Sequence, residues 1–253
     1  VSRPEIDLPQ DIEITDSSVY AKARQNLDHL ISEKALRRDV QANYYLYRQI
    51  MGSHSQLGLV AVASCAEYDD NTIRKHEFTR PDKENDRVSH LEALDAQTGP
   101  VFLTYSADKE LDNLFNRVTE GNPNVDFTAT DGVQHTSWTV TSGEDTSFID
   151  KKFSGIQNLY IADGHHRSAA ASRVNQSRSG AGNSGLFLTV IFPHDQMQIL
   201  PYNRVVRDLN GLSLEEIHNS LGKVFEIELN GRSEPLNKHE IALYINGQLK
   251  YKK

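Results

Sequence analysis

The segment Leu159-Tyr-Ile-Ala-Asp-Gly-His-His-Arg-Ser-Ala-Ala-Ala-Ser-Arg173 predicts a strand, a turn and a helix in immediate succession. Leu159 to Ala162 is a short apolar run typical of a buried strand, and the alanines after the turn favour a helix. Between them, Gly164 lets the backbone turn tightly and approach a ligand without a Cβ in the way. Asp163 to Arg167 bring a carboxylate, two imidazoles and a guanidinium to the start of this helix. A helix N-terminus offers free N–H groups and a positive dipole end, so the segment predicts a phosphate or carboxylate site.

The same turn also has a purely structural interpretation. Aspartate is a favoured N-cap, so Asp163 could cap the helix while His165 to Arg167 stay solvated. However, three further polar groups meet Asp163 directly after a buried strand, and ligands commonly bind where loops leave a rigid scaffold. We therefore favour a functional role for this turn.

Hydrophobic spacing and capping residues predict the elements that precede the segment. Helices are expected after the capping residues Asp16 to Ser18, from Pro81 to about Gln97, and after a cap at Ser106. Runs rich in β-formers, separated by turn residues, predict two hairpins and a strand. The hairpins pair 43–51 with 56–66 and 126–130 with 134–141, and the strand covers 101–105.

The remainder of the chain predicts further short elements. Residues 175–183 have no apolar period and predict a mobile loop. Ser213-Leu-Glu-Glu216 is a capping box that begins a short helix, and Asn246-Gly247 predicts a hairpin turn. Strands are expected over 186–192, 197–202, 224–229 and 241–245. Because helices and strands do not alternate regularly, the predicted fold class is α+β, a mixed fold.

The domain organisation is expected to be simple. The chain has 253 residues, without an internal repeat or a strong linker, so we expect 1–253 to form a single region. A subdivision into an N-terminal helix and hairpin (1–66) and a core that bears the motif (67–253) is the alternative. The chain begins Val1-Ser-Arg-Pro4 without a methionine and ends inside a predicted strand, so we also expect it to be a fragment of a longer protein.

Composition excludes several classes of protein. Hydrophobic residues make up 38% of the chain and charged residues 25%, as in ordinary globular proteins. No apolar stretch has the length of a membrane span and no signal peptide is visible, so no membrane partner is expected. A net charge of −8 makes nucleic acid an unlikely partner. The single cysteine, Cys65, excludes an internal disulfide and suits a cytoplasmic location. It lies in phase with a predicted strand, where it would be an inert core thiol.

A second cluster of charged residues runs from Arg74 to Arg87. Most such runs are solvated loops and helix starts, which is the simpler interpretation. Alternation along a predicted strand would put Lys75 and Glu77 on one face and His76 on the other. Glu77 would then be a candidate general base, held ionised by its basic neighbours Lys75 and Arg80.

A third cluster, Leu200-Pro-Tyr-Asn-Arg-Val-Val-Arg207, follows a predicted strand. The guanidinium of Arg204 beside Asn203 suits bidentate binding of a phosphate or carboxylate, although a surface arginine in a polar loop fits equally well. The remaining histidines show no metal-ligand spacing, and the side chains of the adjacent His165 and His166 should diverge. We therefore expect no zinc site.

In combination, these motifs resemble the ParB/sulfiredoxin-like superfamily. Within it, the chain resembles, over nearly its whole length, a bacterial and archaeal family known only as a domain of unknown function. The resemblance rests on Lys75-His-Glu-Phe-Thr79 with Arg80-Pro-Asp-Lys83, Thr98-Gly-Pro-Val101, Asp163 to Arg167, and Leu200-Pro-Tyr-Asn-Arg204. It implies a ParB/sulfiredoxin-like nucleotide-binding core with additional hairpins and helices.

The motifs are also similar to those of the free L-serine kinases, which phosphorylate the serine hydroxyl with ADP or ATP. In that family a His-Glu pair supplies the proposed catalytic base, and the corresponding pair here is His76-Glu77. The similarity implies catalytic roles for Glu77, Asp163 and His165, with Asp163 near the transferred phosphoryl group or its Mg²⁺. It implies nucleotide phosphate binding by Gly164, His165, His166 and Arg167, and substrate binding by Lys75, His76, Asn203 and Arg204. The sequence ends before any counterpart of their late Pro-Lys-Thr-type segment, and it has a long insertion between Glu77 and Asp163.

The expected function is therefore a nucleotide-dependent phosphotransferase that uses ADP or ATP with Mg²⁺ on a small hydroxyl metabolite such as serine. The alternative is a non-catalytic nucleotide-binding sensor of ParB-like type, read out by a partner protein. Sulfiredoxin chemistry needs a cysteine where His165 stands, and the basic DNA-binding helical domain of ParB proteins has no counterpart here. The expected partners are a nucleotide and a small-molecule substrate, and the oligomeric state is not predicted.

Overall fold

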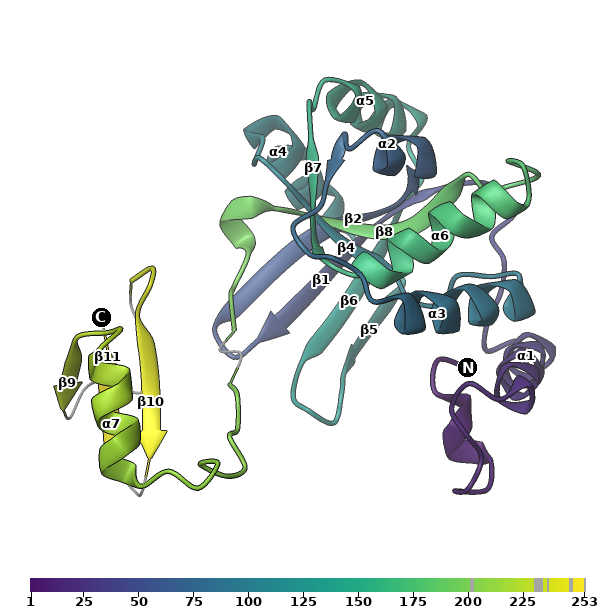
Figure 1. Ribbon diagram of the computed structural model, residues 1–253. Coiled ribbons are helices and arrows are strands. Elements are labelled where there is room, and N and C mark those ends of the chain that lie inside the picture. The colour runs from purple at the N-terminus through teal and green to yellow at the C-terminus, as the bar shows by residue number, and fades with distance from the viewer. Residues whose placement is uncertain (201–202, 230–233, 236, 246–247, 253) are drawn as a thin grey trace. The chain divides into compact units, whose positions relative to one another are not determined.

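A mixed eight-stranded β-sheet forms the centre of the first of two compact units, Val1–Met197 and Gln198–Lys253, in the computed structural model (Figure 1). The structure describes residues 1–200, 203–229, 234–235, 237–245 and 248–252. In sheet order the strands are β3 (Ile73–Arg74), β7 (Leu159–Asp163), β4 (Val101–Tyr105), β8 (Leu186–Pro193), β2 (His54–Ser64), β1 (Tyr44–Met51), β6 (Gln134–Val140) and β5 (Val125–Thr128).

Strand pairing in this sheet is mixed. β3 pairs with β7 and β4 pairs with β8 in parallel, whereas every other neighbouring pair is antiparallel. Both predicted hairpins, β1 with β2 and β5 with β6, lie side by side within it. The α+β class predicted from the sequence is confirmed.

Helices flank the sheet. Figure 1 shows α3 and α6 running side by side; α6 packs between α2 and α3 and contacts β4 and β8, while α1 packs on α3. No helix of the described residues is long and apolar enough to cross a membrane. The helices of this unit are η1 (Pro4–Asp7), α1 (Ser17–Ser32), α2 (Cys65–Asp69), α3 (Pro81–Leu94), α4 (Lys109–Thr119), α5 (Gly143–Ser154), α6 (His165–Ser177) and η2 (His194–Gln196).

The core is built from alternate residues of the central strands. Val101, Leu103 and Tyr105 of β4 are buried while the residues between them are partly exposed, as the two-residue period of a strand requires. Leu111 and Phe115 of α4 pack into the same cluster. The main apolar core therefore joins the sheet to helices such as α4, and a smaller cluster of Ala23, Leu27 and Leu94 joins α1 to α3.

The junction of β7, β4 and α6 positions the candidate site. β7 and β4 are antiparallel, with a register shift between Phe102 and Leu103, and Asp163 at the end of β7 pairs with Phe102. The residues that enter β4, Gly99 and Pro100, therefore lie beside the end of β7, where α6 begins. Strand order thus brings the 98–101 segment next to the 163–167 segment.

The second unit contains α7 (Leu214–Gly222) and a three-stranded sheet in the order β10 (Ile241–Ile245), β11 (Gln248–Lys252) and β9 (Ile227–Leu229). The capping box at Ser213 is confirmed, since the Ser213 side chain accepts from Glu216 N and the Glu216 side chain accepts from Ser213 N. The strand predicted over 224–229 is shorter and covers only β9. The turn predicted at Asn246-Gly247 lies outside the described residues.

The predicted start of α4 and the predicted end of β2 were each wrong by two residues. The cap of α4 is Asp108 rather than Ser106, because the Asp108 carboxylate accepts hydrogen bonds from the backbone N–H groups of Glu110 and Leu111. Cys65 begins α2, capped by Ser64, instead of ending a strand. Cys65 is nevertheless fully buried, and burial raises the pKa of its thiol to about 11, which agrees with an inert core thiol.

Other predicted boundaries of strands, loops and units also differ from those of the structure. No strand forms over 197–200, and Pro201 and Tyr202 lie outside the described residues. Of the predicted loop 175–183, the first three residues belong to α6. The subdivision considered after residue 66 does not coincide with the division into compact units, which falls after Met197, because β1 and β2 are inner strands of the one sheet.

Gly58 of β2 gives a test of the sheet packing. A Cβ at this position would lie 2.8 Å from ring atoms of Phe192, which is 1% exposed and packs against Phe102. Gly58→Ala is expected to lower the free energy of unfolding by about 1–3 kcal/mol through overpacking. Urea unfolding followed by the fluorescence of Trp138, the single tryptophan, would report it.

The matched control is Gly143→Ala. A Cβ at Gly143 has nothing within 4 Å, so stability should change by no more than about 0.5 kcal/mol. An equal effect of both substitutions would contradict the packing argument.

Candidate functional site

The N-terminus of α6 is left open. Gly164 occupies the N-cap position with a φ of 102°, a left-handed conformation that glycine adopts without strain, and no side chain of the described residues caps the helix. Asp163 is the last residue of β7, and its carboxylate pairs with the guanidinium of Arg167 one helical turn later. The capping interpretation of Asp163 is therefore wrong, and the first N–H groups of α6 remain available to a ligand.

The guanidinium of Arg167 is occupied by the protein itself. One of its nitrogens donates to the Pro100 carbonyl and another donates to Asp163. A Cβ on Gly164 would lie 3.1–3.2 Å from this guanidinium, and one on Gly99 would lie 3.5 Å from it, so two glycines make the space in which it lies. Arg167 thereby joins the start of β4 to the end of β7 and the first turn of α6.

The two adjacent histidines both hold the 76–80 segment. Nε2 of His166 accepts a hydrogen bond of 3.1 Å from Arg80 N, and Nε2 of His165 accepts a long one of 3.5 Å from His76 N. A ring nitrogen that accepts must be unprotonated, so the second nitrogen of each neutral ring, Nδ1, carries the hydrogen. In His165, Nδ1 faces the Glu77 carboxylate at 3.4 Å.

His165 is buried, with 4% of its surface exposed. Burial lowers its pKa below the ordinary value of 6.5, and the nearby His76 lowers it further, against the opposing charges of Glu77 and Asp163. The His76 ring stands edge-on to the His165 ring, with the centroids 4.4 Å apart. The neutral form of His165 that the hydrogen bonds require is thus also the form that its surroundings favour.

The strand alternation expected over 75–79 is wrong. β3 ends at Arg74, and the following residues are irregular, so His76 and Glu77 both contact His165 instead of pointing to opposite faces. Lys75 is directed elsewhere: its ammonium donates to the Tyr68 carbonyl at 2.6 Å and lies over the Tyr68 ring.

Arg80, like Lys75, is not the neighbour that was expected for Glu77. Its guanidinium pairs with Asp82 at 2.7 Å. The imidazole of His165 therefore replaces Lys75 and Arg80 as the group beside the Glu77 carboxylate.

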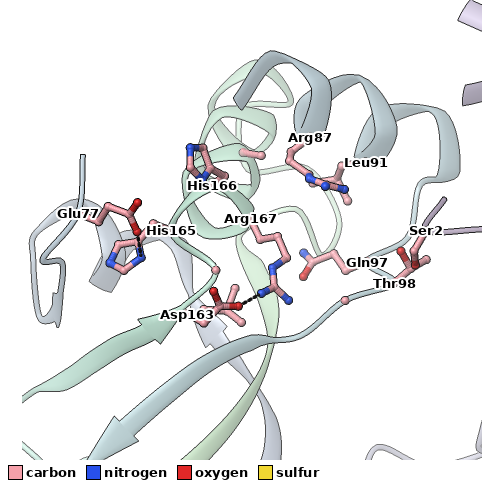
Figure 2. A pocket seen from close by; sticks show the side chains of 14 residues that line it. Ser2, Glu77, Arg87, Leu91, Gln97, Thr98, Asp163, His165, His166 and Arg167 are labelled. Atoms are coloured by element: carbon pink, nitrogen blue, oxygen red, sulfur yellow. Dashed lines mark hydrogen bonds and ion pairs between the residues drawn. The ribbon is translucent and has the colours of Figure 1, made fainter. Parts of the chain in front are cut away.

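These groups open onto a cavity of about 410 Å³. Figure 2 shows Glu77 and His165 on one side of the start of α6, Arg87 and Gln97 on the other side, and Asp163 with Arg167 between them. Of the residues expected to form a site, Glu77 and Asp163 to Arg167 line the cavity. The residues that sequence reasoning missed are Ser2, Arg87, Leu91, Gln97, Thr98, Gly99, Val101 and Ala170.

Arg87 is the most consequential of the missed residues. It comes from α3, and its ion pair with Asp86 spans 3.9 Å, too long for a good hydrogen bond. Arg87 belongs to the charged cluster noticed in the sequence, but only the four-residue spacing to Leu91 on α3 could have indicated that it faces the same cavity. The Thr98-Gly99 segment was singled out by resemblance, without a role.

Asn203 and Arg204 belong to the second compact unit. Their assignment to substrate binding stays a prediction. In the part of the chain that the structure describes, no group of three or more His, Cys, Asp or Glu residues is arranged to hold a metal ion.

The neutral state of His165 makes stability depend on pH. Its native pKa lies below 6.5, so between that pKa and 6.5 the unfolded chain binds the proton more readily than the native protein. The free energy of unfolding should therefore be highest above pH 6.5 and fall as the pH drops towards the native pKa. Urea unfolding between about pH 5 and pH 8, the range in which histidines titrate, measures it.

The comparison with His165→Asn isolates this contribution, because the variant keeps a donor near Glu77 but cannot titrate. Its stability should fall less steeply with acidification, whereas His29→Asn on the exposed face of α1 should leave the slope unchanged. Identical slopes in His165→Asn and the wild type would contradict a buried neutral His165.

Comparison with known proteins identifies a family but no characterised relative. No curated protein and no solved structure matches the chain. The model of the family described as "Protein of unknown function (DUF1015)" matches residues 1–253, the whole chain. The domain-of-unknown-function family expected from the motifs is thus the part of the resemblance that is confirmed. The chain belongs to the DUF1015 family.

Proposed function

We propose that this protein is a nucleotide-dependent phosphotransferase that moves a phosphoryl group from ADP or ATP to the hydroxyl of a small metabolite such as serine. The observation that carries the proposal is the meeting of Glu77, from the 75–80 segment, with the open N-terminus of α6 at one cavity. A base and an anion site are the two elements that such a reaction needs from the protein, since phosphoryl transfer depends mainly on positioning and charge neutralisation.

The phosphates would bind at the start of α6. The uncapped N–H groups of the first turn attract anions, and Arg87 adds a positive charge from α3. In this assignment the main role of Arg167 is to hold the site together, because its guanidinium donates to Pro100 and Asp163. Its remaining N–H groups add positive charge near the phosphates. His165 and His166 likewise position the 76–80 segment through their Nε2 atoms.

Glu77 would act as the general base on the other side of the turn. Its side chain is 59% exposed, so a substrate can reach it, and the N–H of His165 lies behind it at 3.4 Å. The hydroxyl oxygen attacks the terminal phosphorus, the bond from that phosphorus to the nucleotide oxygen breaks, and the hydroxyl proton passes to Glu77. The separation of Glu77 from Arg87 in Figure 2 suits a substrate and a nucleotide that approach from opposite sides.

Mg²⁺ fits this assignment through Asp163. The Asp163 side chain is 73% exposed at the cavity, and a single carboxylate together with nucleotide phosphates is a common way of binding Mg²⁺. The ion would neutralise phosphate charge. The similarity of the Asp163 to Arg167 motif and of His76-Glu77 to the free L-serine kinases supports the same reading.

The residues expected to bind the substrate are assigned differently by the structure and by the resemblance. Asn203 and Arg204 stay candidates by resemblance. His76 is best regarded as a support for His165, given their ring contact. Lys75 has no role in the proposed reaction because its ammonium donates to the Tyr68 carbonyl.

Glu77→Gln tests the chemistry. The substitution keeps the shape of the side chain but removes its basicity, so turnover should fall by about 100-fold to 10,000-fold while nucleotide affinity stays unchanged. The measurement is ADP or ATP consumption with Mg²⁺ and a panel of hydroxy amino acids, alongside calorimetric nucleotide binding. Glu92→Gln, on the exposed face of α3, is the control and should behave as the wild type.

Two results would count against phosphotransfer. Nucleotide binding without turnover, unaffected by Glu77→Gln, would favour the sensor. Absence of nucleotide binding to the wild type would overturn both functions.

Arg87→Met tests the anion site. A hydrogen bond to a charged group contributes about 1.5–3 kcal/mol, so ADP affinity should fall about tenfold to a hundredfold. Arg37→Met, at an exposed arginine outside the cavity, should leave affinity unchanged. Calorimetric titration with ADP compares the three proteins, and wild-type affinity in Arg87→Met would remove Arg87 from the proposed phosphate contacts.

A further inference from the structure

A second cavity, of about 690 Å³, adjoins the first. Leu91 and Gln97 line both, so the two cavities share a wall. The Gln97 amide fixes that wall: its nitrogen donates to the Leu186 carbonyl at 2.9 Å, and its oxygen accepts from Leu188 N. The shared boundary is therefore held to β8.

The same faces of α3 and α6 run past both cavities. On α3, Arg87 and Leu91 lie four residues apart on one helix face and line the first cavity. Leu91 and Asp95, the residue that caps the C-terminus of α3, line the second. On α6, Ala170 lines the first cavity, and Val174, four residues later, lines the second. Because α3 and α6 pack side by side (Figure 1), these faces run together from one cavity to the other.

The length of these faces suits an extended small molecule. From Arg87 to Leu94, the last residue of α3, the rise along the helix is about 10.5 Å. An anion at the N-terminus of α6 would then have room for the rest of its molecule beside Leu91 and Val174.

The loop after α6, residues 178–185, forms one wall of the second cavity and is held by hydrogen bonds. Gly180 N donates to the Asn175 carbonyl at 3.0 Å, and Gly185 accepts from Cys65 N at 2.9 Å, so both ends of the loop are bonded to the body of the unit. Arg178, at the end of the helix, pairs with Asp95 across the cavity rim. Ser179, Gly180 and Gly182 adopt left-handed conformations, which curl the chain tightly. A loop expected from sequence to be mobile is thus hydrogen-bonded on both sides.

The lining combines apolar, polar and charged residues. Leu91, Val174 and Leu188 supply apolar surface from two helices and a strand, and Asn183 and Ser184 supply hydrogen-bonding groups from the loop. The charged residues of the lining are Arg38 and the ion pair of Arg178 with Asp95. Apolar surface with a few polar groups is what a flat heterocycle with polar edges requires. A ligand that is anionic at one end and heterocyclic at the other matches both cavities together.

We propose that the second cavity binds the base and ribose of the nucleotide whose phosphates reach the first cavity along α3. This assignment rests on the proposed function, and it adds where the nucleoside part lies. The base packs between Leu91 and Val174, and the 178–185 loop covers it.

Ala181→Trp tests this assignment. Ala181 is exposed on the loop and lines the second cavity, so an indole can fill the space without entering the core. Calorimetry compares ADP with pyrophosphate, which can use only the first cavity. The variant should bind ADP at least about tenfold more weakly and bind pyrophosphate within about twofold of the wild type. Ala21→Trp, at an exposed position of α1, is the matched control.

Photolabelling with 8-azido-ADP locates the base directly. Labelled peptides should come from residues 174–188, and an excess of adenosine or ADP should protect them from the label. If Ala181→Trp binds ADP as the wild type does, or the label lies elsewhere, this inference fails while the proposed function stands. If the wild type binds neither ADP nor pyrophosphate, both fail.

Discussion

The candidate site depends on the hydrogen bonds that the Arg167 guanidinium makes to the protein. The guanidinium bonds to the carbonyl of Pro100, which leads into β4, and to the carboxylate of Asp163, which ends β7, while it projects from the first turn of α6. Gly99 and Gly164 leave room for it. Two segments that are distant in sequence, around Pro100 and from Asp163 to Arg167, are thereby fixed at one point, where the open N-terminus of α6 lines the cavity.

His165 and His166 join a third segment, residues 76–80, to the same point. His165 and His166 each accept a backbone hydrogen bond from the 76–80 segment, which places Glu77 at the cavity without any regular secondary structure of its own. Thr79 adds to this by bonding to Glu84 of α3, which also pairs with Arg173 of α6 at 3.3 Å. Charged and imidazole groups that would suit direct contact with phosphate thus serve to position backbone. The groups left to meet a ligand are the helix N–H groups, Glu77, Asp163 and Arg87.

Local signals predicted much of the fold. The Asp16 cap, the Ser213 capping box, the two hairpins and the sequence of strand, glycine and helix at 159–173 each depend on neighbouring residues, and each is present. The predictions that failed concern residues whose positions depend on contacts with distant parts of the chain. The 75–79 alternation is absent because distant imidazoles take up the backbone N–H groups there. Arg87 could not be recognised because its partner surface, the start of α6, lies far along the chain.

The only cysteine of the chain, Cys65, contacts the end of the 178–185 loop. The N–H of Cys65 bonds to the Gly185 carbonyl, and its thiol lies 3.6 Å from the Ser184 carbonyl with no exposed surface. A thiol reagent can reach Cys65 only when its surroundings open, and its raised pKa keeps the background reaction slow. The rate of alkylation at this one sulfur therefore measures how often the structure around Cys65, including the loop that lines the second cavity, opens locally.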